Sequence, residues 1–494
     1  MGARCPTERR WPALLVGALT AVALLANVGR LGGQLAGGAL LPVPGLSAVW
    51  SEYLASWHAV GGGSTSPAPP TLAVLGILGA IFYPVGGPST AVAVLLFGDA
   101  PLAGLFCYLA IGRVPVTRPV RALVAAGYGL LPTAMVAVGQ GRLDVVIAHL
   151  LLPGVLAGVA AVAHSAVRLS TACGAALGLA VIGAFQPFVL LTVVLFALAW
   201  FVARPGGGPR RVIALFVIVL LPLLLLVPWP AALVQHPALL ARGVGVTVGP
   251  GPTGLVAGVL PQAVALIAIV IAVLVAVLMR RPVIRPLLPA LGLSLFGTAG
   301  VILLLRLGYW WGPALIVLAA GLLWMLLTAC RTDLGTRRPM SWVLTVRPPT
   351  GRALAGLAVL VLVLFVAGDL IAGRSGPLRP DRDGLTLAAP VATELTDTGR
   401  SVLVLAADGQ PTRQSTGGLP AFGHDDLLAS PGTPARLAAR DEGLRSTDPA
   451  VARATVARAA MAGVLYLVLP DQATADRLRA AAGTEVGTAP PTSG

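Results

Sequence analysis

The residues with the clearest chemical potential lie in the stretch 40–70, which reads LLPVPGLSAVWSEYLASWHAVGGGSTSPAPP. Trp50, Tyr53 and Trp57 are spaced so that a helix over 47–58 would place all three rings on one face. Glu52 and His58 lie among these rings and are candidate acid–base groups. The pattern fits an interfacial aromatic belt that anchors a helix beside a membrane. The alternative is a sugar or lipid-phosphate site, where the rings stack on a sugar and the polar groups act as acid or base.

Two further carboxylates lie next to or inside apolar segments. Asp99, in FGDAP, is a charged group at membrane depth, which is costly and therefore a functional hypothesis. Because Pro101 follows it closely, Asp99 also fits the start of a broken helix. Asp144 follows Arg142 in GQGRLD, and the two could cap a helix or bind a phosphate through the guanidinium group. The sequence leaves open whether Glu52, Asp99 and Asp144 converge.

A second group of basic and aromatic residues is found at RLGYWWG. Arg306, Tyr309 and Trp310 fit a snorkelling arginine with belt aromatics, or the wall of a cavity for phosphate and sugar. His149 lies about one helical turn after Asp144, and we expect it to be packed and bonded to a neighbouring helix. No metal-ligand cluster, phosphate-binding glycine loop or nucleophile motif is identified. The sequence therefore assigns no cofactor, although a divalent metal stays open.

Composition places these residues in a membrane protein. Of the 494 residues 56% are apolar and 11% are charged, whereas a soluble domain has about 25% charged residues. Residues 1–373 hold 22 Arg and six acidic residues, and residues 374–494 hold 12 Arg and 13 acidic residues. The basic excess thus belongs to the apolar part of the chain. It is not gathered on a soluble face, which excludes nucleic acid as a partner.

Apolar runs long enough to cross a bilayer predict about 11–13 transmembrane helices. The runs cover residues 11–28, 71–112, 119–139, 143–165, 171–185, 187–203, 211–229, 253–279, 286–305, 309–329 and 353–372. The number of crossings in 71–112 is open because YPVGGPS and GDAP interrupt it. An interrupted backbone is stable in a membrane only where it is packed in protein or lines a cavity. Eighteen Arg fall on one side and four on the other, which predicts a cytoplasmic N-terminus and an extracytoplasmic tail.

The chain is therefore predicted to be a polytopic α-helical membrane protein of the cell membrane, with a small C-terminal extracytoplasmic α/β domain. Its multi-spanning domain covers residues 1–373 with an outer loop at 30–70, and the tail covers 374–494. In the tail we expect strands at 401–406 and 464–470 and helices at 448–463 and 471–483. The segment 409–426 is rich in turn residues and predicts a surface loop, and the last residues predict disorder.

Several stretches resemble the membrane portion of large multi-spanning glycosyltransferases of actinobacteria. They are the loop at 40–70, DAPLAGLFCYLA, GQGRLDVVIAHLLLPGVLAG and, in the tail, GVLYLVLP. In that family a cytoplasmic family-2 nucleotide-sugar domain precedes a membrane region similar to type C glycosyltransferases, which use polyprenyl-phosphate sugars. That cytoplasmic domain is lacking here, and the triplet Asp381-Arg382-Asp383 is expected in an outer turn. The resemblance implies an essential acid in the first outer loop, beside a metal or a lipid phosphate, and Glu52 matches it.

Two functions follow as hypotheses. The first is transfer of a sugar from a polyprenyl-phosphate donor to an envelope glycan, with Glu52 or Asp99 as base and Arg142 or Arg306 on the phosphate. The second is a non-catalytic scaffold or glycolipid-translocating subunit that works with a separate cytoplasmic glycosyltransferase. A secondary transporter is disfavoured, because no internal repeat and few membrane-embedded charges are found. Membrane lipids are partners in every case.

Overall fold

The computed structural model of the chain divides into two compact units. It describes residues 7–32, 34–162, 168–204, 206, 208–247, 255–280, 285–331, 368, 376–380, 387, 389–405, 412–430 and 432–483. The helical unit comprises Met1–Leu31, Ala91–Val244 and Gly251–Leu378. The mixed unit comprises Gly32–Thr90, Gly245–Pro250 and Arg379–Gly494.

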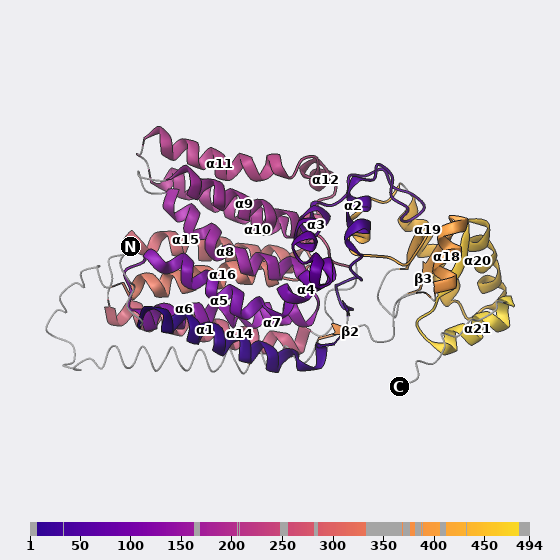
Figure 1. The fold of residues 1–494 in the computed structure, drawn as a ribbon, viewed down its shortest axis with the longest axis horizontal. Helices are drawn as coiled ribbons and strands as arrows, with labels where there is room; N and C mark the ends of the chain where they lie inside the picture. The colour runs from indigo at the N-terminus through magenta and orange to yellow at the C-terminus, as the bar shows by residue number, and fades with distance from the viewer. Residues whose placement is uncertain are drawn as a thin grey trace. The chain divides into compact units, whose positions relative to one another are not determined.

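The helical unit is a bundle whose long helices run side by side (Figure 1). Its helices are α1 (Thr7–Asn27), α5 (Asp99–Ala110), α6 (Arg118–Gly129), α7 (Pro132–Gly139), α8 (Leu143–Val162), α9 (Leu169–Phe185), α10 (Pro187–Ala203), α11 (Pro209–Leu225), α12 (Trp229–Gln235), α13 (Ala238–Arg242), α14 (Leu255–Arg280), α15 (Leu288–Arg306) and α16 (Gly312–Ala329). Helix α8 packs against α5, α9, α11 and α16. It is buried along most of its length, so the polar groups that it carries must find partners inside the bundle.

Five helices among the described residues are long and apolar enough to cross a membrane, or up to seven if each of two bent pairs is one span. Helices α9 and α10 have 17 residues each, which corresponds to about 25 Å. They meet at Gln186-Pro187, as predicted, because proline disfavours helical backbone in the residue before it. The polytopic helical fold is confirmed. The run 353–372 lies outside the described residues, and the number of crossings and the orientation stay predictions.

The interrupted segment 71–112 forms three short helices, α3 (Pro70–Ile81), α4 (Gly87–Phe97) and α5. Helix α5 with the turn after it is bent by 69° relative to α4. Twelve residues of helix reach about 18 Å, which is too short for a bilayer core of about 30 Å. The first break ends at Gly86, with a φ angle of +119°, and α4 begins at Gly87, with a φ angle of +70°. The predicted interruptions are therefore real breaks in the helical backbone.

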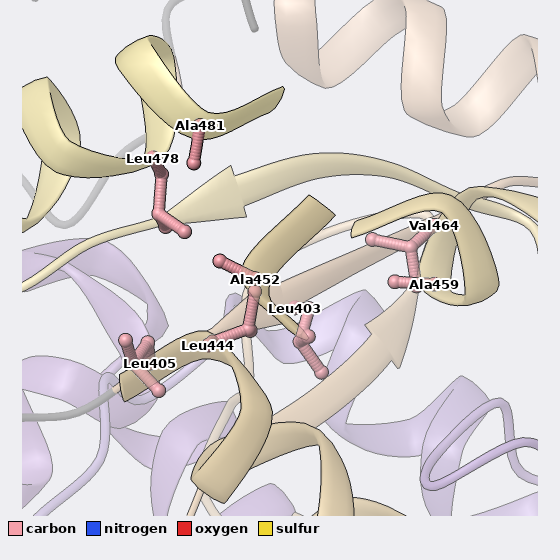
Figure 2. Packing of buried hydrophobic residues seen from close by; sticks show 8 residues of the cluster. All are labelled: Leu403, Leu405, Leu444, Ala452, Ala459, Val464, Leu478 and Ala481. Carbon is pink, nitrogen blue, oxygen red and sulfur yellow. The ribbon is translucent and has the colours of Figure 1, made fainter. Parts of the chain in front are cut away.

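The mixed unit contains a three-stranded sheet in the order β4-β3-β5. Strand β3 (Ser401–Val404) pairs antiparallel with β4 (Arg413–Thr416) and parallel with β5 (Val464–Val468). The tail helices are α18 (Ala389–Thr398), α19 (Thr433–Arg445), α20 (Pro449–Met461) and α21 (Gln472–Ala482). Figure 2 shows the core between sheet and helices, formed by Leu403, Leu405, Leu444, Ala452, Ala459, Val464, Leu478 and Ala481.

The strands and the two helices predicted in the tail are confirmed, and so is the small C-terminal α/β domain. The surface loop predicted at 409–426 is wrong in part, because it contains β4. The sequence of this strand, RQST, is polar, but Gln414 and Ser415 are buried by pairing with β3. Hydrogen bonding to a neighbouring strand overrides local hydrophobicity here. The triplet Asp381-Arg382-Asp383 and the C-terminal residues lie outside the described residues.

The segment predicted as an outer loop packs with the tail strands. A two-residue strand β1 (Leu35–Ala36) pairs with β2 (Arg379–Pro380), and α2 (Leu46–Leu54) follows. A hairpin closes where His58 pairs with Ser64 around three glycines of positive φ, Gly61–Gly63. The Gly61 amide donates to the Gln414 carbonyl at 2.9 Å. The hairpin therefore extends the sheet beyond β4. The predicted boundary at residue 374 stays a prediction.

The N-cap of α20 gives a direct test of tail stability. The Asp448 carboxylate accepts a hydrogen bond from the Ala450 amide at 2.8 Å. We expect Asp448→Ala to lower the free energy of opening of α20 by about 1 kcal/mol, because a helix-end amide loses its partner. Hydrogen exchange of the α20 amides in the full chain measures this. Glu442→Ala, an exposed carboxylate inside α19, is the control, and an equal effect in both variants would contradict the capping role.

Candidate functional site

Asp99 and His149 form a buried pair that joins three helices. The Asp99 carboxylate oxygens lie 2.9 and 3.1 Å from Nδ1 of His149 on α8. Nε2 of His149 lies 2.9 Å from the carbonyl oxygen of Tyr128 on α6. The Tyr128 hydroxyl donates to the His149 carbonyl at 2.8 Å. The Asp99 and His149 side chains are 1% and 0% exposed, so this cluster is closed to solvent.

The partners of His149 determine where its protons lie. A carbonyl oxygen only accepts, so Nε2 of His149 carries a hydrogen, and a second proton is shared between Nδ1 and the Asp99 carboxylate. Both ring nitrogens are thus engaged, and His149 is bonded to neighbouring helices as expected. At the start of α5 the side chain of Asp99 bonds to His149, and the residue at the cap position, Gly98, offers no side-chain bond. A base role of Asp99 stays a prediction.

Asp144 and Arg142 form a second buried pair, at the start of α8. Arg142 donates from Nε to Oδ1 at 3.0 Å and from Nη2 to Oδ2 at 2.8 Å. Gln186, at the break between α9 and α10, donates to the same Oδ2 at 2.8 Å. Arg142 also donates to the Arg242 carbonyl at 2.7 Å. Its guanidinium carbon lies 4.7 Å from the ring centroid of Trp310, a cation–π distance.

These contacts bear on the two hypotheses for Arg142, which are helix capping and phosphate binding. Two of its nitrogens, Nε and Nη2, already bond to Asp144, so the bidentate face that would suit a phosphate is occupied. Two atoms next to the pair, Oε1 of Gln186 and Nε1 of Trp310, are buried and have no hydrogen-bond partner among the described residues. Arg306 is exposed at the end of α15. Tyr309 packs in a cluster with Phe188 and Trp311 from the ends of neighbouring helices.

Glu52 and His58 form the third pair, in the mixed unit. Nδ1 of His58 lies 2.7 Å from Oε1 of Glu52, and their side chains are 0% and 27% exposed. Since a carboxylate only accepts, Nδ1 of His58 carries the hydrogen of this bond. Nε2 of His58 is buried without a partner among the described residues. Glu52 is therefore the accessible member of the pair, and His58 orients it.

The helix predicted over 47–58 is shorter than expected, because α2 ends at Leu54 and the backbone is extended from Ala55. This extension brings His58 into the hairpin with Ser64. Trp50 and Tyr53 remain on the helix, with ring centroids 5.9 Å apart. The prediction that Trp57 shares their face on one helix is wrong.

Sequence analysis did not single out His424, Asp425 and Arg413, which belong to the same unit as this pair. His424 accepts a hydrogen bond at Nδ1 from the Ala421 amide at 3.1 Å. Burial lowers the pKa of His424 and the charge of His58 adds to this, while Glu52 and Asp425 act in the opposite direction. Arg413 donates to both oxygens of Asp425, at 2.9 to 3.1 Å. In the sequence, the polar motif GHDD could have pointed to His424 and Asp425, but it lies in the segment that was predicted to be a surface loop.

A metal centre is not found in the part of the chain that the structure describes. No group of three or more His, Cys, Asp or Glu side chains there could hold a metal ion. Asp99 and Asp144 belong to the helical unit and Glu52 to the mixed unit. Each of the three carboxylates has a charged or imidazole partner within its own unit.

No family model and no curated protein matches the sequence. The fold is similar to that of the arabinofuranosyltransferase AftD from Mycobacteria, with a TM-score of 0.58 at 17% identity over 95% of this chain and 35% of AftD. Two structures of a mutant AftD give TM-scores of 0.58 and 0.55 at 17% identity, over 95% and 93% of this chain and 37% and 36% of theirs. The chain spans about a third of AftD, and the likeness is one of fold.

The Asp99–His149 pair predicts a large effect on stability. We expect His149→Leu to destabilise the chain by about 3–5 kcal/mol, because it leaves a carboxylate buried without a partner. Thermal unfolding of the full chain in detergent measures this, with the exposed His236→Leu as control. Adding Asp99→Asn removes the orphaned charge and should recover part of the loss. A melting temperature of His149→Leu equal to that of the control would contradict the structural role.

The lowered pKa of His424 predicts a pH dependence of the mixed unit. Above about pH 6.5 the ring is neutral in the folded and unfolded states, so His424 does not affect stability. As the pH falls below that value the unfolded state takes up the proton first, and stability decreases. Opening free energies of the β4 amides from hydrogen exchange at pH 7.5 and 5.5 measure this loss. It should be smaller in His424→Gln and unchanged in His236→Gln, and an equal loss in both variants would contradict it.

Proposed function

We propose that the chain belongs to a cell-envelope glycosyltransferase that moves a sugar from a polyprenyl-phosphate donor to a glycan at the outer membrane face. The observation that carries the proposal is the fold shared with AftD over 95% of the chain. The Glu52–His58 pair supports it, because transfer to a hydroxyl needs a base and Glu52 is an accessible carboxylate held by a hydrogen bond.

The geometry suggests how the pair would act. Oε1 of Glu52 is held by Nδ1 of His58, which leaves Oε2 for the hydroxyl group of the acceptor. That oxygen takes the hydroxyl proton while the acceptor oxygen forms a bond to the anomeric carbon of the donor. The bond from that carbon to the phosphate oxygen breaks, and polyprenyl phosphate leaves with the electron pair. Glu52 is thus the proposed catalytic base and His58 a positioning residue.

The donor phosphate needs a cation, and the two arginine candidates differ in their availability. The Arg142 fork is occupied by Asp144, whereas Arg306 is exposed. Within the helical unit, Arg306 is therefore the better candidate to bind a phosphate. The rings of Trp50, Tyr53 and Trp57 remain candidates for stacking on sugar.

The test of this proposal is Glu52→Gln, which keeps the shape of the side chain and removes its basicity. We expect transfer of labelled sugar into envelope glycan, in membranes that carry the full chain, to fall by at least about 100-fold. Glu442→Gln should transfer as the wild type does. His58→Gln should shift the pH profile of the remaining activity, because the carboxylate loses its hydrogen-bond donor.

The opposite outcome would favour the scaffold alternative. Wild-type transfer in Glu52→Gln, with glycan lost only when the whole chain is deleted, would indicate a non-catalytic subunit.

A further inference from the structure

A cavity of about 460 Å³ lies within the mixed unit, between the hairpin, strand β4 and helix α19. This volume falls in the range of about 300–1,000 Å³ that is usual for small-ligand sites. Its apolar lining includes Val60, Pro420, Leu427, Pro434, Leu437 and Ala438. Segments more than 350 residues apart in sequence thus build one concave surface, with contacts suited to the C–H groups of a ligand.

The charged groups of the cavity neutralise one another. Arg413 and Asp425 form an ion pair of 2.9 Å. Asp441 pairs with Arg445 at 3.0 Å and accepts a hydrogen bond from the Thr412 hydroxyl. An ionic ligand would find its counter-charge already engaged, so the lining favours an uncharged molecule.

Two neutral hydrogen-bond donors remain for a ligand. Gln414 is 7% exposed, and its Oε1 accepts from Arg440, which identifies the other terminal atom as the NH₂ group. No described residue bonds to that group. His424 uses Nδ1 to accept from a backbone amide, so its neutral ring carries the hydrogen on Nε2. No described residue bonds to this atom either. Both residues line the cavity.

We propose that this cavity binds a neutral oligosaccharide, the glycan acceptor of the transfer proposed above. Sugars combine apolar C–H faces with many hydroxyl oxygens and no charge, which matches an apolar lining with two free neutral donors. The identification of this ligand as the acceptor rests on the proposed function. His424 lines the cavity. It also lies close enough to the proposed base for the charges of Glu52 and His58 to influence its pKa.

Helix α19 offers a matched pair of variants for the test. Ala438 and Ala439 are adjacent and both exposed, but only Ala438 lines the cavity. Ala438→Trp should fill the cavity and Ala439→Trp should leave it open, and neither disturbs a buried core. Gln414→Ala removes a donor from the cavity, and Gln472→Ala removes an amide on the exposed surface of α21.

The experiment measures binding to the full chain in detergent by saturation-transfer NMR and calorimetry. The probes are neutral tetrasaccharides of arabinofuranose and of mannose, a tetrasaccharide that contains glucuronate, and tetra-alanine. We expect a neutral tetrasaccharide to bind the wild type and Ala439→Trp equally, and Ala438→Trp at least tenfold more weakly. Gln414→Ala should weaken binding about tenfold, and Gln472→Ala should not weaken it.

Three outcomes would overturn the inference: no neutral tetrasaccharide binds, Ala438→Trp binds as tightly as Ala439→Trp, or only the glucuronate probe or tetra-alanine binds. The failure of the proposed function is separate. We expect Glu52→Gln to bind the neutral tetrasaccharide normally while transfer is lost. If Glu52→Gln keeps transfer and Ala438→Trp still loses binding, the catalytic proposal fails and the cavity assignment stands.

Discussion

The helical unit depends on the pairing of its buried charges, above all on Asp144. An ionised group in an apolar bundle is stable only when opposite charge and hydrogen bonds surround it. Asp144 collects Arg142 and Gln186, and Arg142 continues to the Arg242 carbonyl and the Trp310 ring. One carboxylate thereby fixes the start of α8, the break between α9 and α10, the end of α13 and the turn before α16. The irregular backbone at these points is packed in protein, which is the condition for its stability in a membrane.

Asp99, Asp144 and Glu52 differ in how far each carboxylate is exposed and in how many hydrogen-bond partners it has. Asp99 and Asp144 are 1% and 0% exposed, and each meets a cationic or imidazole partner within its own unit. Glu52 meets one imidazole nitrogen and stays partly exposed. By residue type alone, the three carboxylates are equally good candidates for an acid–base role. Burial and partner count distinguish two carboxylates that hold helices together from one that stays partly exposed.

Hydrophobic patterning predicted the helices, the break at Gln186-Pro187 and two of the tail strands, because burial in apolar surroundings imposes that pattern directly. It did not predict β4, whose RQST sequence is polar and whose position depends on pairing with β3. It also did not predict the bonds from His149 to Asp99 and from Gln186 to Asp144, because these residues lie 50 and 42 positions apart in the sequence. Within the mixed unit, His424 and Arg413 were missed for the same reason. Such contacts depend on tertiary packing, which leaves no periodicity in the sequence.

The pairing of the hairpin at 58–64 with β4 has a consequence for biosynthesis. Val60 and Ser415 are bridge partners, so the hairpin is made roughly 350 residues before the strand that it covers. Protein synthesis adds about 5–20 residues per second, so the edge of the hairpin stays unpaired for on the order of 20–70 s before β4 is synthesised. An uncovered edge is a template for pairing with other chains. Glycine is disfavoured in extended strands. The three consecutive glycines therefore make the unpaired hairpin a poor template for strand pairing with other chains before β4 is synthesised.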